Sequence, residues 1–322
     1  MKKIAVLCSG GDGPGMNAAL RSVVRTAIYN QMEVIGVRKG YTGLVQEDQH
    51  YLTASSVGNI IHKGGTMLKT SRCPEFMTPE GRAKAAQNLS KHNVDALVVI
   101  GGDGSFKGAK KLSEEHNINV MGIPGTIDND ILGTDYTIGH STAVETATAA
   151  VDKIRDTAYS HSRTFLVEVM GRSSSAIGLE VALCTGAENI IFPSQDIPYE
   201  EVIKGIKRGL SRQKSSSIII VIEDNKPGVS YKIQKELKDN YSLDAHVCIL
   251  GHIQRGGTPN PKDRLTASLM GNKVIECLLK GERNQVMIER KGTIENCSID
   301  LCLDRRKWSE SERIKLIKTL SI

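Results

Sequence analysis

The fold is decided by a stretch that reads INVMGIPGTIDND over residues 118–130. Residues 118–123 are apolar and predict a short buried strand, and open α/β sheets bind ligands in the loops that follow such strands. In an extended segment, Thr126, Asp128 and Asp130 would point to one side and could hold a substrate hydroxyl and its proton. The alternative is a turn in which Asp and Asn side chains bond to their own backbone. This stretch alone does not decide between the two.

The order of apolar strand, glycine-rich turn and helix recurs along the chain. Residues 4–8 precede the turn SGGDGPGMN at 9–17, and an amphipathic helix then extends to about residue 30. Residues 95–100 precede GGDGS at 101–105, and residues 106–116 predict another helix. A glycine turn at a helix N-terminus lets a phosphate approach backbone N–H groups. The pattern predicts an α/β protein that binds phosphorylated ligands.

Asp103 lies within the second glycine turn. This turn lacks the Lys-Ser/Thr pair of a Walker motif, but it places one carboxylate among glycines that allow close approach of a metal ion. We therefore interpret Asp103 as a Mg²⁺ ligand at the edge of a phosphate site. The alternative, a structural hairpin, would need a second strand immediately after the turn, where the sequence predicts a helix.

Composition excludes several classes of protein. The chain has 322 residues and 39% apolar residues, which suits one large or two smaller globular domains, and no apolar run is long enough to span a membrane. Strand-like residues begin at the N-terminus, so we expect no signal peptide and a cytoplasmic location. The seven scattered cysteines form no C-x-x-C pair and predict free thiols, mostly buried. A net charge of +6 without basic runs, with 4% aromatic residues, argues against nucleic-acid binding.

Charged side chains recur at the predicted ends of later strands. Arg172 follows the strand at 164–170, Glu223 follows 218–222, and His252 and Arg255 follow 247–250. Such groups suit a phosphorylated substrate, although a single histidine is more often structural. Arg72 lies on a predicted loop, where an exposed, solvated arginine is the alternative.

The sequence also predicts the local structure of two segments between these motifs. Residues 41–44 predict a loop, and Val57 is expected to begin a helix that ends at Gly64 and Gly65.

With these motifs combined, the chain resembles the bacterial 6-phosphofructokinases over nearly its whole length. The similar segments are SGGDGPGMN at 9–17, GGDGS at 101–105, PGTIDND at 124–130, MGR at 170–172 and GHIQRGG at 251–257. The resemblance implies transfer of the γ-phosphate of ATP to the 1-hydroxyl of fructose 6-phosphate, a step of glycolysis, with Mg²⁺ as cofactor. It implies a three-layer α/β/α fold of two similar Rossmann-like domains: a larger ATP-binding domain, 1–138 plus 251–305, and a smaller fructose 6-phosphate-binding domain, 139–250 plus 306–322, which contains Trp308.

The resemblance also implies roles for individual residues. Asp128 would accept the hydroxyl proton with Thr126 and Asp130 beside it, Arg172 would stabilise charge on the transferring group, and Asp103 would hold Mg²⁺. The ATP-binding positions are Gly11, Tyr41, Arg72, Cys73, Gly102, Asp103, Gly104 and Ser105. The substrate-binding positions are Thr126, Asp128, Arg163, Met170, Gly171, Arg172, Glu223, His246, His252 and Arg255. Arg163 matches a residue that reaches in from a neighbouring subunit, which implies a homotetramer with shared active sites.

Two glycines indicate the phosphoryl donor. Pyrophosphate-using relatives usually carry Asp at the position of Gly104 and Lys at that of Gly125, and these side chains fill space that the nucleotide needs. Glycine at both positions favours ATP over pyrophosphate. Other kinases with a GGDG turn, such as NAD or lipid kinases, lack the TIDND and GHIQR segments. A catalytically silent regulatory subunit is also considered, but the presence of Asp103, Asp128 and Arg172 disfavours it.

Some positions depart from the family pattern. His246 replaces a usual arginine of the neighbouring subunit, and a shorter side chain without the guanidinium fork predicts weaker and more pH-dependent substrate affinity. A site for ADP or another nucleotide effector would use Arg21, Arg25, Arg155, Glu188, Arg212 and Lys214. Ala54 and Asn59 replace a usual Arg and Asp in that site, which predicts blunted activation by ADP.

Overall fold

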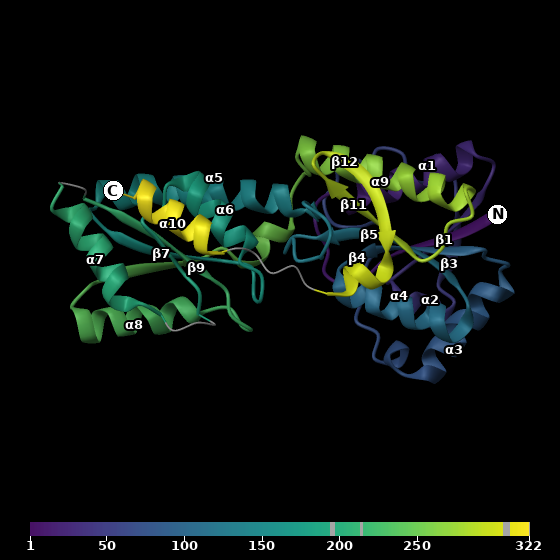
Figure 1. Cartoon of the computed structure of the whole chain (residues 1–322), viewed down its shortest axis with the longest axis horizontal. Coiled ribbons are helices and arrows are strands. Elements are labelled where there is room, and N and C mark those ends of the chain that lie inside the picture. Colours follow the sequence, from purple (N-terminus) through teal and green to yellow (C-terminus); the bar gives the residue numbers. More distant parts are fainter. Residues whose placement is uncertain (194–196, 213–214, 305–309, 322) are drawn as a thin grey trace. The chain divides into compact units, whose positions relative to one another are not determined.

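In a computed structural model of the chain, the described residues are 1–193, 197–212, 215–304 and 310–321. The chain divides into two compact units, the first of Met1–Thr142 and Arg255–Arg306 and the second of Ala143–Gln254 and Lys307–Ile322 (Figure 1). The divisions after residues 142 and 254 lie four residues beyond the expected 138 and 250. Trp308 lies outside the described residues. Within the described part of the chain, we find no helix with the length and apolarity needed to cross a membrane.

The first unit is built on a sheet with the strand order β12-β11-β5-β4-β1-β2-β3, and β6 pairs with β5. The strands are β1 (Lys3–Cys8), β2 (Glu33–Val37), β3 (Gln49–Leu52), β4 (Ala96–Gly101), β5 (Asn119–Thr126), β6 (Ile138–Gly139), β11 (Gln285–Arg290) and β12 (Thr293–Ser298). Only β3 and β12 pair antiparallel among them. The helices are α1 (Met16–Tyr29), α2 (Tyr41–Gln46), α3 (Pro79–Lys91), α4 (Asp103–His116) and α9 (Pro261–Leu279), with 3₁₀ segments η1 (Glu75–Met77) and η3 (Ile299–Leu303).

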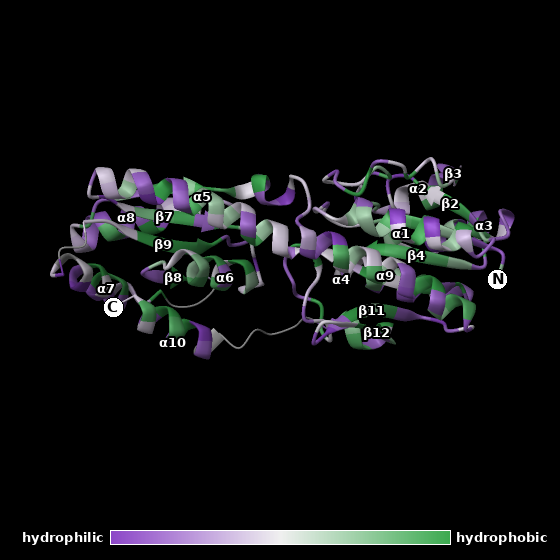
Figure 2. Cartoon of the chain, turned by 90° about the horizontal axis from the view of Figure 1, so that it is seen from above, coloured by the Kyte–Doolittle hydropathy of each residue, from purple (hydrophilic) through white to green (hydrophobic). Residues whose placement is uncertain are grey.

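Alternation along the central strands creates two apolar layers in this unit. Val6 of β1 and Val98 of β4 face one cluster, which includes residues of α1 and α9, whereas Leu7 and Val99 face the other, which includes residues of α2, α3 and α4. Successive strand residues point to opposite faces, so a strand that is apolar at every position must be covered on both sides. Helices lie on both faces of the sheet in Figure 1, and the strands are largely apolar in Figure 2.

The second unit contains a four-stranded parallel sheet in the order β10-β7-β9-β8. The strands are β7 (Thr164–Val169), β8 (Asn189–Ile191), β9 (Ser217–Ile222) and β10 (Ala245–Ile249). The helices are α6 (Ala176–Thr185), α7 (Tyr199–Leu210), α8 (Val229–Tyr241) and α10 (Glu310–Leu320). Apolar residues of α7 and α8 pack on one face of the sheet, while α6 and α10 lie on the other (Figure 1). The predicted three-layer α/β class is confirmed.

Two elements continue across the division between the units. The long helix α5 (His140–Ser160) begins in the first unit, and the 3₁₀ segment η2 (Gly251–Arg255) begins in the second.

Two local predictions were wrong. Residues 41–44 form the start of helix α2 rather than a loop, because Tyr41, Leu44 and Val45 are buried in the apolar layer beneath the sheet. No helix begins at Val57: residues 54–59 form turns. Reciprocal bonds between Thr53 and Ser56 satisfy the backbone locally there, since Ser56 N–H donates to Thr53 Oγ1 and Thr53 N–H donates to Ser56 Oγ.

The expected extended face of Thr126, Asp128 and Asp130 is also wrong. Strand β5 ends at Thr126, residues 127–128 form a turn, and Asn129 has a positive φ of 48°. The amide of Asp128 donates to Thr126 Oγ1 at 3.3 Å, so this turn uses a threonine hydroxyl, whereas the alternative that we considered used Asp and Asn side chains. The polar groups therefore cluster through a turn and not through strand periodicity.

Candidate active site

Three loops of the first unit gather at one edge of its sheet. Strands β1, β4 and β5 are parallel neighbours, so their carboxyl ends point the same way. These ends continue into the segments 9–15, 102–105 and 127–130. A methyl group at Gly102 would lie 3.7 Å from Thr126 Cβ, which places the second glycine turn against the end of β5. The sheet thus brings the two glycine turns and the carboxylate loop together, as the motifs predicted.

The first glycine turn depends on positive φ angles and on an arginine from far along the chain. Gly10 and Gly15 have φ of 86° and 94°, a region open to glycine. Arg255 Nη1 donates to Asp12 O at 3.1 Å, and a methyl group at Gly11 would lie 2.3 Å from the same nitrogen. Arg255, assigned from the resemblance to sugar-phosphate binding, therefore lies directly beside a predicted ATP-binding residue.

The loop at 70–73 lies next to this turn. Thr70 Oγ1 donates to Gly10 O at 2.5 Å, and Ser71 Oγ donates to Lys39 O at 3.0 Å. The side chain of Arg72 is exposed, whereas Cys73 is partly buried against the apolar layer of α2, α3 and α4. The structure thus brings the predicted ATP-binding residues Gly11, Arg72 and Cys73 into one region.

The second glycine turn opens directly into helix α4. Asp103 is its first residue, half-buried, with one carboxylate oxygen 3.3 Å from Lys107 Nζ. Apart from its chain neighbours and the backbone of its own helix, no heavy atom of the described residues lies within 4 Å of a methyl group placed on Gly104, so the space beside the helix N-terminus is open. Mg²⁺ is commonly held by one or two carboxylates together with substrate phosphates. A partly exposed carboxylate beside open space and N-terminal amides fits that requirement.

Tyr41 supports the second turn from within the core. Its hydroxyl donates to Ser105 O at 2.5 Å, and its ring stacks on Phe76 with centroids 4.0 Å apart. Tyr41 is 7% exposed, and this burial raises the pKa of its phenol. The contact observed for Tyr41 is therefore with the backbone that shapes the turn.

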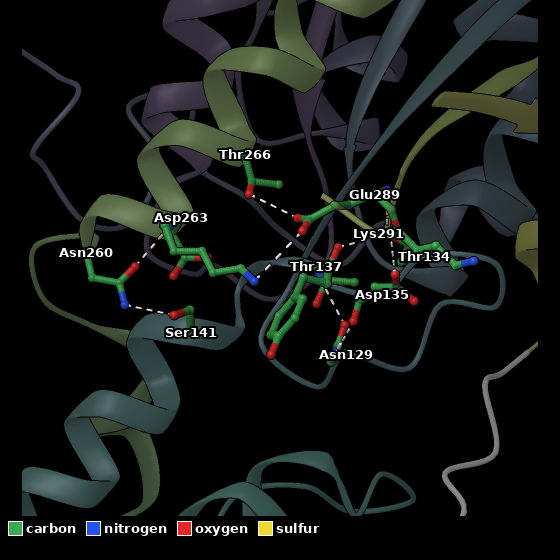
Figure 3. A network of polar contacts seen from close by, with 12 residues as sticks. Asn129, Thr134, Asp135, Thr137, Ser141, Asn260, Asp263, Thr266, Glu289 and Lys291 are labelled. Carbon is green, nitrogen blue, oxygen red and sulfur yellow. Dashed lines mark hydrogen bonds and ion pairs between the residues drawn. The ribbon is translucent and has the colours of Figure 1, made fainter. Parts of the chain in front are cut away.

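The carboxylate loop is braced by residues that the sequence did not single out. Asn129 is fully buried; its Nδ2 donates to Asp135 O at 3.0 Å and its Oδ1 accepts from Thr137 N at 2.9 Å (Figure 3). Thr137 Oγ1 in turn donates to Thr126 O at 2.5 Å. Asp128 is half-buried and Asp130 is 8% exposed. Asn129 bonds to Asp135 and Thr137, which lie beyond the reach of an Asx-turn, so no local sequence signal identified it as the brace.

The second unit brings another group of predicted residues to the carboxyl edge of its own sheet. Arg172 follows β7 and Glu223 follows β9, and these strands are parallel neighbours. Arg172 Nε lies 3.6 Å from Glu223 Oε1; the arginine is 55% exposed and the glutamate 6%. A methyl group at Gly171 would lie 2.5 Å from Ser174 O, so the tight turn before Arg172 needs glycine.

The neighbouring strand β10 continues into η2, which carries His252 and Gln254. His252 is exposed, and Gln254 is fully buried with its Oε1 accepting from Met170 N at 2.9 Å. The sequence did not single out Gln254. Its contact fixes the backbone just before Gly171 and Arg172.

Arg163 and His246 lie away from this group. Arg163 precedes β7, and His246 is the second residue of β10, paired in register with Phe165. Both residues are at the amino ends of the strands, whereas Arg172 follows the carboxyl end of β7. At roughly 3.3 Å per residue, the two ends of such a segment are about 20 Å apart. Within one chain, the second unit therefore does not bring these two residues to Arg172.

The predicted effector residues are distributed over both units. Arg21 and Arg25 lie on α1 of the first unit. In the second unit, Arg155 Nη1 lies 3.7 Å from Glu188 Oε1, and Arg155 Nη2 donates to Thr185 O at 2.6 Å. Arg212 is exposed after α7, and Lys214 lies outside the described residues.

Comparisons with known proteins give consistent results along the chain. The sequence pattern of the family described as Phosphofructokinase matches residues 3–278. The chain is 50% identical over 323 residues to proteins of Bacillus velezensis and Bacillus subtilis, each named ATP-dependent 6-phosphofructokinase, with the whole of both chains covered. A protein of the same name from Halothermothrix orenii is 46% identical over 332 residues, again with full coverage.

Solved structures agree with this result. The chain matches phosphofructokinase from Saccharomyces cerevisiae with a TM-score of 0.86 and 36% identity, covering 99% of this chain and 46% of the yeast chain. It thus spans about half the length of that larger relative. A pyrophosphate-dependent phosphofructokinase from Marinobacter aquaeolei matches with a TM-score of 0.85 at 20% identity, over 97% of this chain and 86% of the other, which shows a shared fold. On the family pattern and on relatives aligned from end to end, the chain belongs to the phosphofructokinase family.

Proposed function

We propose that the chain is an ATP-dependent 6-phosphofructokinase, which transfers the γ-phosphate of ATP to the 1-hydroxyl of D-fructose 6-phosphate. The main support for the proposal is that two glycine turns and the Thr126–Asp128 turn lie at one edge of the sheet. The chain is also 50% identical to an enzyme of that name. The products would be fructose 1,6-bisphosphate and ADP.

In the proposed reaction, Asp128 accepts the proton of the 1-hydroxyl as its oxygen attacks the γ-phosphorus. The bond between that phosphorus and the oxygen bridging it to the β-phosphate breaks, and ADP leaves with the electron pair. Thr126, at the end of β5, and Asp130, on the loop that follows, are assigned to orienting the acceptor. Such positioning is the main contribution that a protein makes to phosphoryl transfer.

Arg172 is assigned to charge stabilisation on the transferring phosphoryl group. Its planar guanidinium suits the equatorial oxygens of that group. The neighbouring Glu223 carboxylate, 3.6 Å away, holds the guanidinium in place and is assigned to the sugar together with Met170, Gly171 and His252.

Asp103 is assigned as the Mg²⁺ ligand beside the ATP phosphates. When bound, Mg²⁺ neutralises phosphate charge. The chain's own contribution is the carboxylate of Asp103 and the backbone amides at the start of α4. ATP would be held by Gly11, Arg72, Cys73, Gly102, Gly104 and Ser105, with Tyr41 supporting Ser105 from below.

Glycines 104 and 125 support ATP as the donor. Open space at Gly104 leaves room for a nucleotide. The side chain of an aspartate at this position would occupy the same space. At Gly125, even a methyl group would lie 3.1 Å from both Ile100 Cγ2 and Met16 Cε. A lysine at Gly125 would therefore require a shift of these neighbours.

The positions of Arg163 and His246 support a shared active site. Both lie at the amino ends of their strands, where they cannot serve the Arg172 site of the same unit. We propose that each reaches the substrate phosphate of a neighbouring copy, in a homotetramer. A nucleotide effector such as ADP would bind through Arg21, Arg25, Arg155, Glu188, Arg212 and Lys214.

The decisive test is product formation from fructose 6-phosphate and Mg²⁺ with either ATP or pyrophosphate, comparing the wild type with Asp128→Ser. Activity with ATP alone, lost in the variant, is the expected result. Activity with pyrophosphate would overturn the donor assignment. Absence of activity with either donor would favour a regulatory, non-catalytic chain.

A further inference from the structure

Asp263 is a buried carboxylate in the first turn of α9, and its side chain accepts hydrogen bonds from the end of β6 and the first turn of α5. The residue is 2% exposed. Its Oδ1 accepts from Gly139 N at 2.9 Å, and its Oδ2 accepts from Thr142 N at 2.8 Å and from Thr142 Oγ1. A single side chain of α9 therefore binds the junction of β6 and α5.

The hydrogen bonds to Asp263 favour the charged form of its carboxylate, although burial opposes it. Burial raises the pKa of Asp263, and the bonds from Thr142 and Gly139 act in the opposite direction by stabilising the charged form. Amides at a helix N-terminus also favour an anion, so the start of α5 is a suitable partner. Asn260 reinforces the same contact: its Oδ1 accepts from Asp263 N at 3.0 Å and its Nδ2 donates to Ser141 Oγ at 2.9 Å.

From this junction, three contacts lead to the backbone before Asp128. Gly139 pairs in register with Thr126 across β6 and β5. Thr137 Oγ1 donates to Thr126 O, and His140, which is fully buried, places Nδ1 2.8 Å from Ile127 O. The two carbonyls that precede Asp128 are thus both bound by the segment that Asp263 anchors.

We propose that Asp263 is a positioning residue for the phosphoryl-transfer base, acting on Asp128 through β6 and the first turn of α5. The inference rests on the proposed function, since it takes Asp128 as the base. Asp263 touches neither substrate in this scheme; it sets where the Thr126–Asp128 backbone lies.

The test compares Asp263→Asn with Thr266→Val. The first variant keeps the shape of the side chain but loses its charge and one acceptor. The second lies on the same helix and removes a buried bond, from Thr266 Oγ1 to Glu289 Oε2 at 3.2 Å, that does not reach residues 137–142. We expect Asp263→Asn to lower kcat by about 10–100-fold, the cost typical of lost supporting contacts. KM for ATP should stay unchanged in both variants, because neither substitution changes a residue of the glycine turns, and Asp263→Asn keeps the Cβ and backbone that lie beside Gly15.

Hydrogen exchange gives a readout that does not depend on activity. The amides of Gly139 and Thr142 should exchange faster in Asp263→Asn, and should keep wild-type rates in Thr266→Val. If Asp263→Asn does not fold, Thr142→Val, which removes one of the three donors, should lower kcat in the same direction by a smaller factor.

The possible outcomes separate the inference from the proposed function. An inactive wild type refutes the proposed function, while the exchange rates still report whether Asp263 anchors the segment. An active wild type with equal kcat in Asp263→Asn and Thr266→Val refutes the positioning role. Unchanged exchange at residues 137–142 refutes the anchoring itself.

Discussion

Arg172 holds its guanidinium 3.6 Å from the Glu223 carboxylate while its backbone has a φ of 52°, a left-handed conformation unusual for a residue with a side chain. The ion pair and the tight turn at Gly171 together direct a half-exposed cation to the carboxyl edge of the sheet. Such backbone strain is frequent at functional sites.

Arg172→Lys should therefore lower kcat sharply. Lysine keeps the charge and meets a similar backbone restriction, but it lacks the planar fork that matches phosphoryl oxygens. Removing one such transition-state donor typically lowers kcat by about 10²–10³-fold. Steady-state kinetics at saturating ATP and fructose 6-phosphate would measure this, and a kcat close to that of the wild type would contradict the assigned role.

Gly104→Asp should reduce kcat/KM for ATP without unfolding the protein. The added side chain enters open space beside the N-terminus of α4, where it would meet the nucleotide phosphates. Gly205→Asp is the matched control, since it also adds a carboxylate to a helix, at a Cβ position with no heavy atom of the other described residues within 4 Å beyond the helix's own backbone. Equal kcat/KM for ATP in both variants would exclude Gly104 from donor selection.

His246→Arg should increase the affinity for fructose 6-phosphate at neutral pH. Arginine supplies a permanent charge and two parallel donors to a phosphate, which the shorter imidazole cannot. The measurement is KM for fructose 6-phosphate at neutral pH. An unchanged KM at neutral pH would show that His246 does not contact the sugar phosphate.

Activation by ADP should be weak, and Ala54→Arg combined with Asn59→Asp should strengthen it. Both positions lie on exposed turns, and Asn59 already has a positive φ of 54°, which aspartate also accepts. Added charges give ADP a larger difference in affinity between conformational states. Activation curves at subsaturating fructose 6-phosphate would compare the two proteins. A strongly activated wild type would refute the expectation.

Glu115→Gln should destabilise the first unit at neutral pH but not in acid. Arg82 of α3 is 4% exposed and binds Glu115 of α4 through two nitrogens, at 2.6 and 2.7 Å. The hydrogen bond to Arg82 lowers the pKa of Glu115 below its ordinary value of 4.5. The carboxylate therefore stabilises the folded state above pH 4.5, and this contribution is lost as pH falls through the lowered pKa. Urea midpoints of the two proteins should differ at pH 7 and converge below pH 4.5; a constant difference would contradict the assignment.

Local sequence patterns predicted most of the parallel strands and the positions of the glycine turns, but not helix α2; the chemistry assigned to the turns stays a prediction. Apolar runs such as 96–100 specify buried strands, and glycines such as Gly10 permit the turns that follow. These features depend on neighbours in the chain. The family resemblance rests on the same segments, which explains why the fold class was predicted correctly.

Tertiary structure alone decided which polar groups support one another. The buried Asn129 bonds to residues 135 and 137, and the anchoring of Gly139 by Asp263 joins residues 124 positions apart. The helix at Tyr41 likewise forms because the core buries its apolar face. Hydrogen bonds and burial of this kind depend on which segments come into contact in the fold. The spacing and periodicity of residues in the sequence do not predict those contacts.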